Sequence, residues 1–167
     1  MSRSDHPAPP ERPALPMAAL IVVATLAVSI LGGLVSAGSD DAWYANLNKA
    51  PLTPPDITFA IVWPLLYLLM AIAAIRVRLA AGRFEDASAA LGLFFVQLVP
   101  NLAWSYAFFG FHQAGLAMLI LVALWALVLA TAFAFWRHDR IAALLLLPYF
   151  LWVSFAGYLN GWIVATN

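Results

Sequence analysis

Five long apolar stretches, almost free of charged side chains, dominate the sequence. They cover residues 17–37, 54–77, 87–109, 114–136 and the segment that follows Arg140 and runs to Ala165. Each could cross the roughly 30 Å hydrocarbon core of a bilayer as a helix, which takes about 20 residues. Lipid offers the backbone no hydrogen-bond partners, so apolar runs of this length must be helical. The sequence therefore predicts an all-α fold, an integral membrane bundle of five transmembrane helices.

Composition excludes several classes of protein. Hydrophobic residues make up 65% and charged residues 10% of the chain, whereas a soluble domain carries about 25% charged residues. The net charge is zero, so the chain has no basic field for nucleic acid. The absence of cysteine removes disulfides, thiolate metal sites and thiol nucleophiles. We expect membrane lipid as the surrounding medium, no nucleic-acid partner and no metal.

The distribution of proline and of positive charge indicates the domain boundary and the orientation. Residues 1–16 are polar and contain five prolines, which predicts a disordered tail before one domain at 17–167. The first apolar stretch is too long for a cleaved signal peptide. Seven of the eight Lys and Arg residues fall in the tail and in the connections after the second and fourth spans; only Lys49 lies opposite. The positive-inside rule then places the N-terminus in the cytoplasm, if the protein is in an inner membrane.

Charged residues lie outside the spans or at their ends, which argues against a proton-coupled transporter, a charge-lined channel and acid–base catalysis. We predict no catalytic residue. His112 is expected to be a solvated turn residue rather than a haem ligand, and Asp40 and Asp41 to solvate a loop rather than bind metal. The second span has a start signal, with Thr53 as the cap and Pro54 at the first helical position.

Polar and aromatic side chains form stripes at helical spacing on three spans. The stripes are Phe59, Trp63, Tyr67 and Met70; Gln97, Asn101, Trp104 and Phe108; and Tyr149, Trp152, Ala156 and Asn160. One interpretation is that the amides only join helices, at about 0.6–2 kcal/mol each. The other is an aromatic small-molecule pocket with a few polar groups. Pro64, Pro100 and Pro148 would bend their helices and leave space between them.

Three linked motifs resemble the TspO/MBR family, which includes the tryptophan-rich sensory proteins, the translocator proteins and the peripheral-type benzodiazepine receptors. The first runs from Trp43 to Lys49 and continues through Pro54-Pro55, Phe59, Trp63, Tyr67 and Met70. The second is Gln97-Leu98, Asn101, Trp104 and Phe108-Phe109-Gly110, and the third is Pro148-Tyr149, Trp152, Ala156 and Leu159-Asn160. The resemblance extends from about Gly33 to Asn160, in order and at the family's spacing.

The resemblance implies a five-helix bundle, often a homodimer, with a pocket that binds porphyrin-like hydrophobic ligands. The pocket residues carried over from the family are Gly33, Ser36, Phe59, Ala60, Trp63, Tyr67, Asn101, Trp104, Trp152, Ala156 and Leu159. No resident cofactor is implied, and porphyrin or haem would be a ligand.

We therefore expect a membrane receptor, sensor or translocator that regulates stress responses or tetrapyrrole and pigment metabolism. Two alternatives stay open: a light-dependent porphyrin-degrading enzyme, and a structural or assembly protein that binds no ligand. Ala50, Leu52 and Ile57 stand where the family usually has Lys-Pro and tryptophans. This less aromatic first loop argues against the degrading activity.

Overall fold

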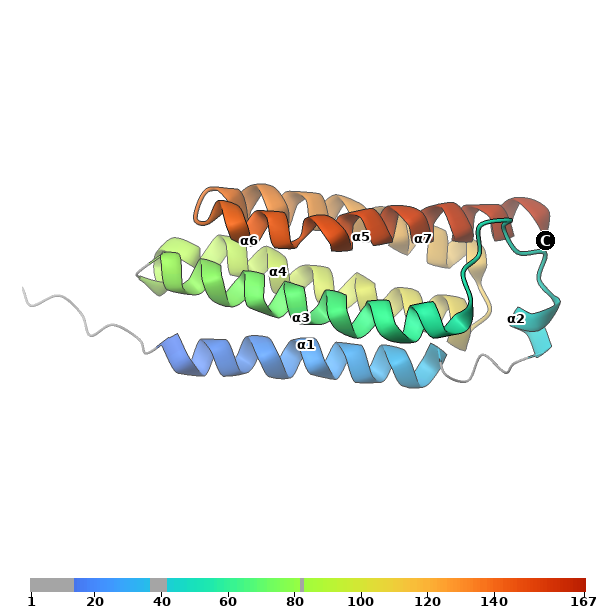
Figure 1. Cartoon of the computed structure of the whole chain (residues 1–167), viewed down its shortest axis with the longest axis horizontal. Coiled ribbons are helices and arrows are strands. Elements are labelled where there is room, and N and C mark those ends of the chain that lie inside the picture. Colours follow the sequence, from blue (N-terminus) through green and yellow to red (C-terminus); the bar gives the residue numbers. More distant parts are fainter. Residues whose placement is uncertain (1–13, 37–41, 82) are drawn as a thin grey trace, which may run out of the picture.

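The computed structural model describes residues 14–36, 42–81 and 83–167 as helices joined by short connections (Figure 1). The elements are α1 (Ala14–Ser36), α2 (Ala42–Asn46), α3 (Asp56–Ala80), α4 (Phe84–Ser105), the π-helix η1 (Tyr106–Gly110), α5 (Ala114–Trp136), α6 (Arg140–Leu145) and α7 (Leu147–Thr166). Within the described residues, five spans are long and apolar enough to cross a membrane, with η1 extending α4 and with α6 and α7 forming one span. The predicted all-α, five-span fold is confirmed.

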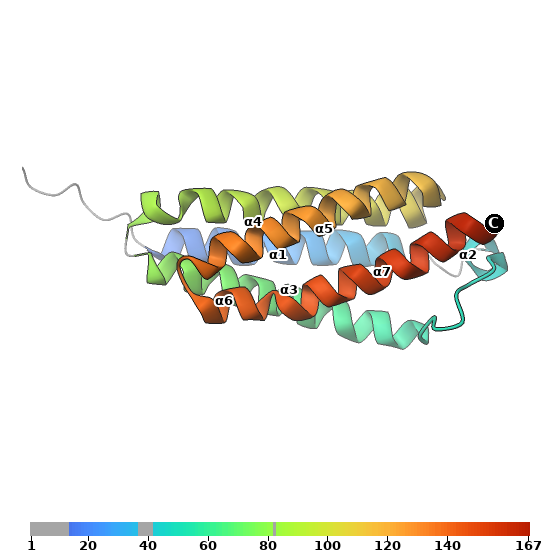
Figure 2. The ribbon, with the colours of Figure 1, turned by 90° about the horizontal axis from the view of Figure 1, so that it is seen from above.

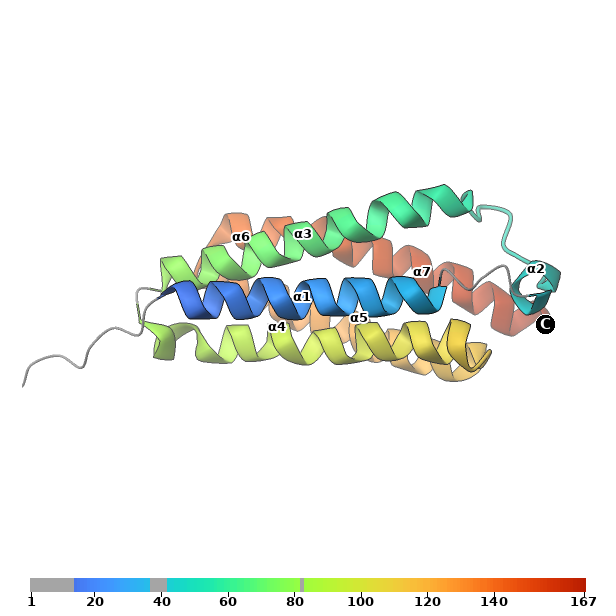
Figure 3. The ribbon, with the colours of Figure 1, turned by 90° about the horizontal axis from the view of Figure 1, so that it is seen from below.

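The helices form three layers. Helix α1 covers α3 and α4 on one side, and α5 packs on the other side with α6 and α7 (Figures 1 and 3). The start of α1, the α3–α4 connection and the α5–α6 connection share one end of the bundle, whereas α2 and the C-terminus lie at the other (Figures 1 and 2). We call the first the arginine end. The second, which carries the loop after α2, we call the lid end.

The outer surface of the bundle is apolar, as a lipid-facing surface requires. Leu119 and Val99, for example, are 70% and 68% exposed. The buried polar side chains lie between helices, among them Gln97, Asn101 and Asn160. Asn101 and Asn160 are hydrogen-bonded there, as the cost of an unpaired amide in hydrocarbon requires, whereas the side-chain amide of Gln97 has no hydrogen-bond partner among the described residues.

Several predicted boundaries change. Helix α1 begins at Ala14, earlier than expected, and residues 1–13 with Asp40 and Asp41 lie outside the described part of the chain. The predicted Thr53 cap with Pro54 as first helical residue is wrong: α3 begins at Asp56, Pro55 occupies the N-cap position, and no side chain caps the helix. The amide of Thr53 instead donates to the carbonyl of Ala50 at 2.9 Å, because this segment forms a turn.

The arginine end is fixed by an ion pair between α3 and the start of α6. A guanidinium nitrogen of Arg76 lies 2.7 Å from Asp139, whose carboxylate also accepts from the amides of Ile141 and Ala142. Desolvation alone would raise the pKa of Asp139, but these two hydrogen bonds and Arg76 outweigh it and lower the pKa. Asp139 thus caps α6 and ties it to α3.

A candidate ligand-binding cavity

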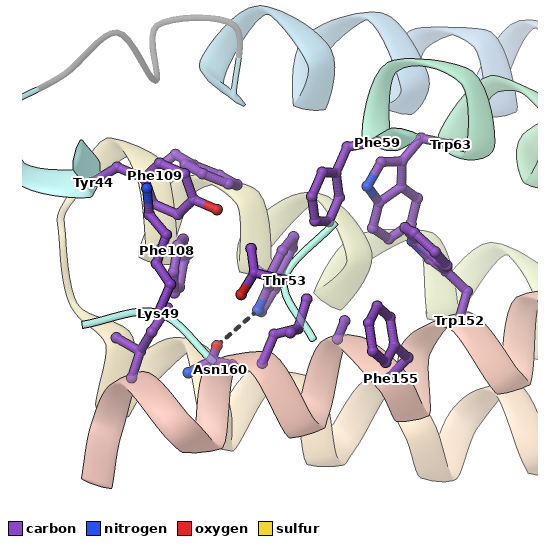
Figure 4. Close-up of a pocket in the computed structure, with 14 residues that line it drawn as sticks. Tyr44, Lys49, Thr53, Phe59, Trp63, Phe108, Phe109, Trp152, Phe155 and Asn160 are labelled. Atoms are coloured by element: carbon purple, nitrogen blue, oxygen red, sulfur yellow. Dashed lines mark hydrogen bonds between the residues drawn. The ribbon is translucent and has the colours of Figure 1, made fainter. Parts of the chain in front are cut away.

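An aromatic cavity of about 40 Å³ lies at the lid end, between α3, α4, η1 and α7 and beneath the loop that follows α2 (Figure 4). Its walls are almost entirely apolar. The lining residues are Tyr44, Lys49, Thr53, Phe59, Trp63, Trp104, Phe108, Phe109, Trp152, Phe155, Ala156, Leu159, Asn160 and Ile163.

Helices α3 and α7 supply one wall, where Phe59 and Trp63 face Trp152. The ring centroids of Trp63 and Trp152 are 6.3 Å apart and nearly perpendicular, and those of Phe59 and Trp152 are 5.6 Å apart, also edge to face. Edge-to-face pairs at 4.5–7 Å are a favoured aromatic geometry. Figure 4 shows the three side chains converging from the two helices, so their mutual contacts fix the shape of this wall.

The π-helix η1 supplies the opposite wall. The ring of Phe108 stacks on Trp104 at 5.6 Å, and Phe109 meets Trp104 edge to face at 5.9 Å. In a π-helix the hydrogen bond spans five residues, as between the amide of Phe111 and the carbonyl of Tyr106 at 2.8 Å. A full turn of the wider π-helix brings the chain back to the side of Trp104 between positions 108 and 109. Phe108 and Phe109 therefore both line the cavity.

The polar groups of Trp104, Asn160 and Trp152 border the cavity on the side of the helices. The indole N–H of Trp104 donates to the side-chain oxygen of Asn160 at 3.1 Å, the dashed line in Figure 4. The amide nitrogen of Asn160 in turn donates to the carbonyl of Ala114 at 2.8 Å. The indole nitrogen of Trp152, by contrast, is buried and has no hydrogen-bond partner among the described residues. The Trp152 indole N–H is thus an unsatisfied donor on a residue that lines the cavity.

A buried hydrogen-bond network lies next to the cavity. The hydroxyl of Tyr67 donates to the side-chain oxygen of Asn101, whose amide nitrogen donates to the hydroxyl of Tyr149. The three residues come from α3, α4 and α7, and the Tyr67 ring lies 6.0 Å from that of Trp63. The network joins the helices that carry the cavity walls.

The loop at residues 47–55 partly covers the cavity through Lys49 and Thr53, and we call it the lid. Its Lys49 ammonium lies 4.2 Å from the centre of the Tyr44 ring. Burial, and then the nearby Asp56 carboxylate, raise the pKa of the Tyr44 phenol, so Tyr44 is neutral at physiological pH. Asn48 is tied to the C-terminal end of α7: its backbone amide donates to the side-chain oxygen of Asn167 at 2.9 Å, and its carbonyl accepts from the hydroxyl of Thr166 at 3.2 Å.

The structure brings most of the expected pocket residues to this region. Six line the cavity: Phe59, Trp63, Trp104, Trp152, Ala156 and Leu159. Tyr67 and Asn101 belong to the adjacent network. The remaining three, Gly33, Ser36 and Ala60, are not among the lining residues.

Those three residues have different surroundings. Gly33 is exposed, and a side chain added there would meet nothing within 4 Å in the described structure. The hydroxyl of Ser36 donates to the carbonyl of Gly32 at 2.6 Å, and Ala60 is exposed on α3. His112 is exposed as expected, but its ring stacks on Trp43 at 4.4 Å.

Other lining residues were not predicted as pocket residues. Phe155 and Ile163 could have been found, because with Trp152, Leu159 and Asn160 they follow the i, i+3, i+7, i+8, i+11 spacing of one helical face. Phe109 breaks that spacing and faces the cavity only because η1 is a π-helix. No local sequence signal identifies the lid residues, since the lid is held by a contact with the C-terminus.

Comparison with known proteins identifies the family of this chain. The family model of the TspO/MBR family matches residues 20–165. Protein CrtK of Rhodobacter capsulatus is 40% identical over 146 residues, covering 87% of this chain and 89% of that protein. Tryptophan-rich protein TspO of Chlorobaculum tepidum is 36% identical over 89% of this chain and 94% of its own. Translocator protein of Sus scrofa is 39% identical over 80% and 82%. The chain is a multi-pass integral membrane protein and belongs to the TspO/MBR family.

Proposed function

We propose that this protein is a membrane receptor that binds a flat, aromatic, tetrapyrrole-like ligand in the cavity at the lid end. The observation that carries the proposal is the convergence of aromatic rings from α2, α3, α4, η1 and α7 on one cavity. A sensory or translocating role, in stress or tetrapyrrole metabolism, is part of the proposal. Relatives are named tryptophan-rich sensory protein in Cereibacter sphaeroides and translocator protein in Sus scrofa.

The chemistry of the walls suits such a ligand. A planar macrocycle offers faces that stack on indole and phenyl rings and edges that meet them edge to face. The free indole N–H of Trp152 supplies a directional hydrogen bond to an acceptor on the ligand. Lys49, the one charged residue among those lining the cavity, suits an acidic group at the ligand's edge.

The cavity in its closed form is far smaller than a tetrapyrrole. A volume of about 40 Å³ has room for a few water molecules at most, since each needs about 10–15 Å³ of such space. Ligand entry therefore requires the lid to move away from α7, which breaks the contacts of Asn48 with Thr166 and Asn167. The bundle beneath stays joined by the Tyr67–Asn101–Tyr149 network.

Tryptophan fluorescence quenching by protoporphyrin tests the proposal on the purified full chain. Trp152→Ala removes stacking and the free N–H, and we expect binding to weaken about tenfold, the equivalent of 1.4 kcal/mol. Trp152→Phe keeps a ring and should lie between Trp152→Ala and the unchanged protein. The matched control is Trp125→Phe, since the Trp125 indole bonds Ser154 outside the cavity at 2.9 Å. Equal affinity for Trp152→Ala and Trp125→Phe would refute the cavity as the binding site.

The same preparation separates the two alternatives. The Trp63 ring lies 6.2 Å from that of Trp104 and 6.3 Å from that of Trp152, so a porphyrin bound in the cavity would lie beside oxidisable indoles. Loss of porphyrin absorbance in light, faster than in empty micelles and slowed by Trp152→Phe, would identify a degrading enzyme. A melting temperature that no porphyrin concentration shifts would instead identify a protein that binds no such ligand.

A further inference from the structure

A second hollow lies at the arginine end, between the last turns of α5 and the α6–α7 junction. It is a groove of about 370 Å³, lined by Leu129, Ala132, Phe133, Trp136, Ala143, Leu144, Leu146, Leu147 and Phe150. Figures 1 and 2 show α6 at the opposite end of the bundle from α2. This groove is therefore separate from the aromatic cavity.

The sequence explains why a groove forms here. Pro148 occupies the first turn of α7 and has no N–H to continue the α6 hydrogen-bond ladder, so the span breaks at Leu146. Ala132 on α5 and Ala143 on α6 are too small to fill the space at the break. Trp136 and Phe133 stand on one side of the groove and Leu147 and Phe150 on the other.

The chemistry of the lining selects an apolar occupant. Every lining side chain is aliphatic or aromatic, so water in the groove would find few hydrogen-bond partners there. From Leu129 to Trp136 the groove follows α5 for seven residues, or about 10 Å. This is about two-thirds of the hydrocarbon thickness of one leaflet, taken as half of roughly 30 Å.

Positive charge gathers at the mouth of the groove. Arg137 follows the last residue of α5 and Arg140 is the first residue of α6. The Arg140 guanidinium lies 5.6 Å from the centre of the Trp136 ring, which lines the groove. The nearby carboxylate of Asp139 is paired with Arg76, and within the described residues no ion pair involves Arg137 or Arg140.

We propose that this groove is a binding site for an anionic phospholipid. One acyl chain lies in the groove along α5, and the phosphate is held between Arg137 and Arg140. Basic pockets between transmembrane helices are suited to anionic headgroups, and guanidinium binds phosphate through paired hydrogen bonds. A second copy of the chain suits the groove less well, because a two-fold contact would bring the arginines of both copies together.

Native mass spectrometry of the purified full chain tests the proposal, with titration by phosphatidylglycerol and phosphatidylcholine of the same acyl composition. We expect tighter binding of phosphatidylglycerol. Arg137→Gln and Arg140→Gln should each reduce the preference about fivefold, the effect of one basic residue near an anionic headgroup. Arg83→Gln is the matched control: it removes the same charge at the same end of the bundle, on the α3–α4 connection, and should leave the preference unchanged.

Filling the groove tests the acyl-chain half of the proposal. Ala132→Phe should weaken binding of both lipids, and Leu147→Trp, at an exposed position on the rim, is a second filling variant if Ala132→Phe does not fold. Equal affinity of the unchanged protein for the two lipids would overturn the proposal. An equal loss in Arg83→Gln and Arg140→Gln would also overturn it, since it would indicate diffuse charge. Lipid binding that is unaffected by a filled groove would also overturn the proposal. A filling variant that converts a dimer to a monomer would overturn it too, because it would show that a second copy occupies the groove.

Discussion

Replacing Asn101 by Leu tests whether the buried network stabilises the bundle through satisfied hydrogen bonds. The substitution removes the acceptor of the Tyr67 hydroxyl and the donor to the Tyr149 hydroxyl. Asn101 and Tyr149 are 2% and 0% exposed, so water cannot take its place. An unsatisfied buried polar group costs about 1–3 kcal/mol, and interhelical bonds in membranes fall toward the low end of that range. Two unsatisfied hydroxyls should lower the free energy of unfolding by about 2–4 kcal/mol.

The triple variant with Asn101→Leu, Tyr67→Phe and Tyr149→Phe provides the decisive comparison. It lacks both hydrogen bonds but leaves no polar group of the network unpaired, and replacing both partners of a buried bond with apolar groups is close to neutral. We expect its stability to recover to within about 1 kcal/mol of the unchanged protein, by the same principle. Reversible unfolding in mixed micelles, titrated with a denaturing detergent, measures all forms.

Asn46→Ala removes an exposed amide whose one bond within the described part of the chain is to the carbonyl of Ala42 in its own short helix, at 2.7 Å, and should change stability by less than about 0.5 kcal/mol. A triple variant that is no more stable than Asn101→Leu alone would refute the reasoning. The stability would then depend on the bonds themselves rather than on avoiding unpaired groups.

Two further predictions concern the two ends of the bundle. Asn167→Ala removes the bond to the Asn48 amide and should speed protoporphyrin association several-fold in stopped-flow quenching, without changing the helix content; an unchanged rate would show that the lid opens independently of this bond. The pKa of Asp139 is lowered in the folded state from its ordinary 3.8, so its stabilising effect is complete above that pH and is lost as the pH falls through the folded-state value. Asp139→Asn should therefore be less stable than the unchanged protein at neutral pH, and the gap should close in acid.

The five spans could be predicted from sequence because the signal is additive over about 20 residues. Short local features of the fold could not be predicted from that signal. Helix α2 has five residues, too short for a periodic pattern, and the start of α3 is set by the turn at Ala50 rather than by Thr53. The π-helix after Ser105 likewise follows from packing against neighbouring helices, not from a residue type that marks it.

The candidate cavity was predictable to the extent that helical faces are. Trp63, Trp104 and Trp152 meet because each lies on the polar-aromatic stripe of its span. The lid was not predictable, because its anchor is a contact between Asn48 and Asn167, 119 residues apart. The resemblance also placed Gly33 in the pocket, and in the closed structure Gly33 is an exposed residue of α1; its role in the pocket stays a prediction.

The closed lid has a consequence for how such a receptor would signal. If the open form is a minor population, the observed dissociation constant is the intrinsic one divided by the open fraction. A ligand too large for the closed cavity stabilises only the open form, so binding separates the lid from the C-terminal residues Thr166 and Asn167. Under the proposed function, ligand occupancy would thereby be converted into a rearrangement at the membrane surface, whereas the Tyr67–Asn101–Tyr149 network would hold the helices in place. Variants that weaken the lid contact should raise the apparent affinity for the ligand. The same variants should reduce the structural difference between the free and bound proteins, because both effects depend on the equilibrium between closed and open lid.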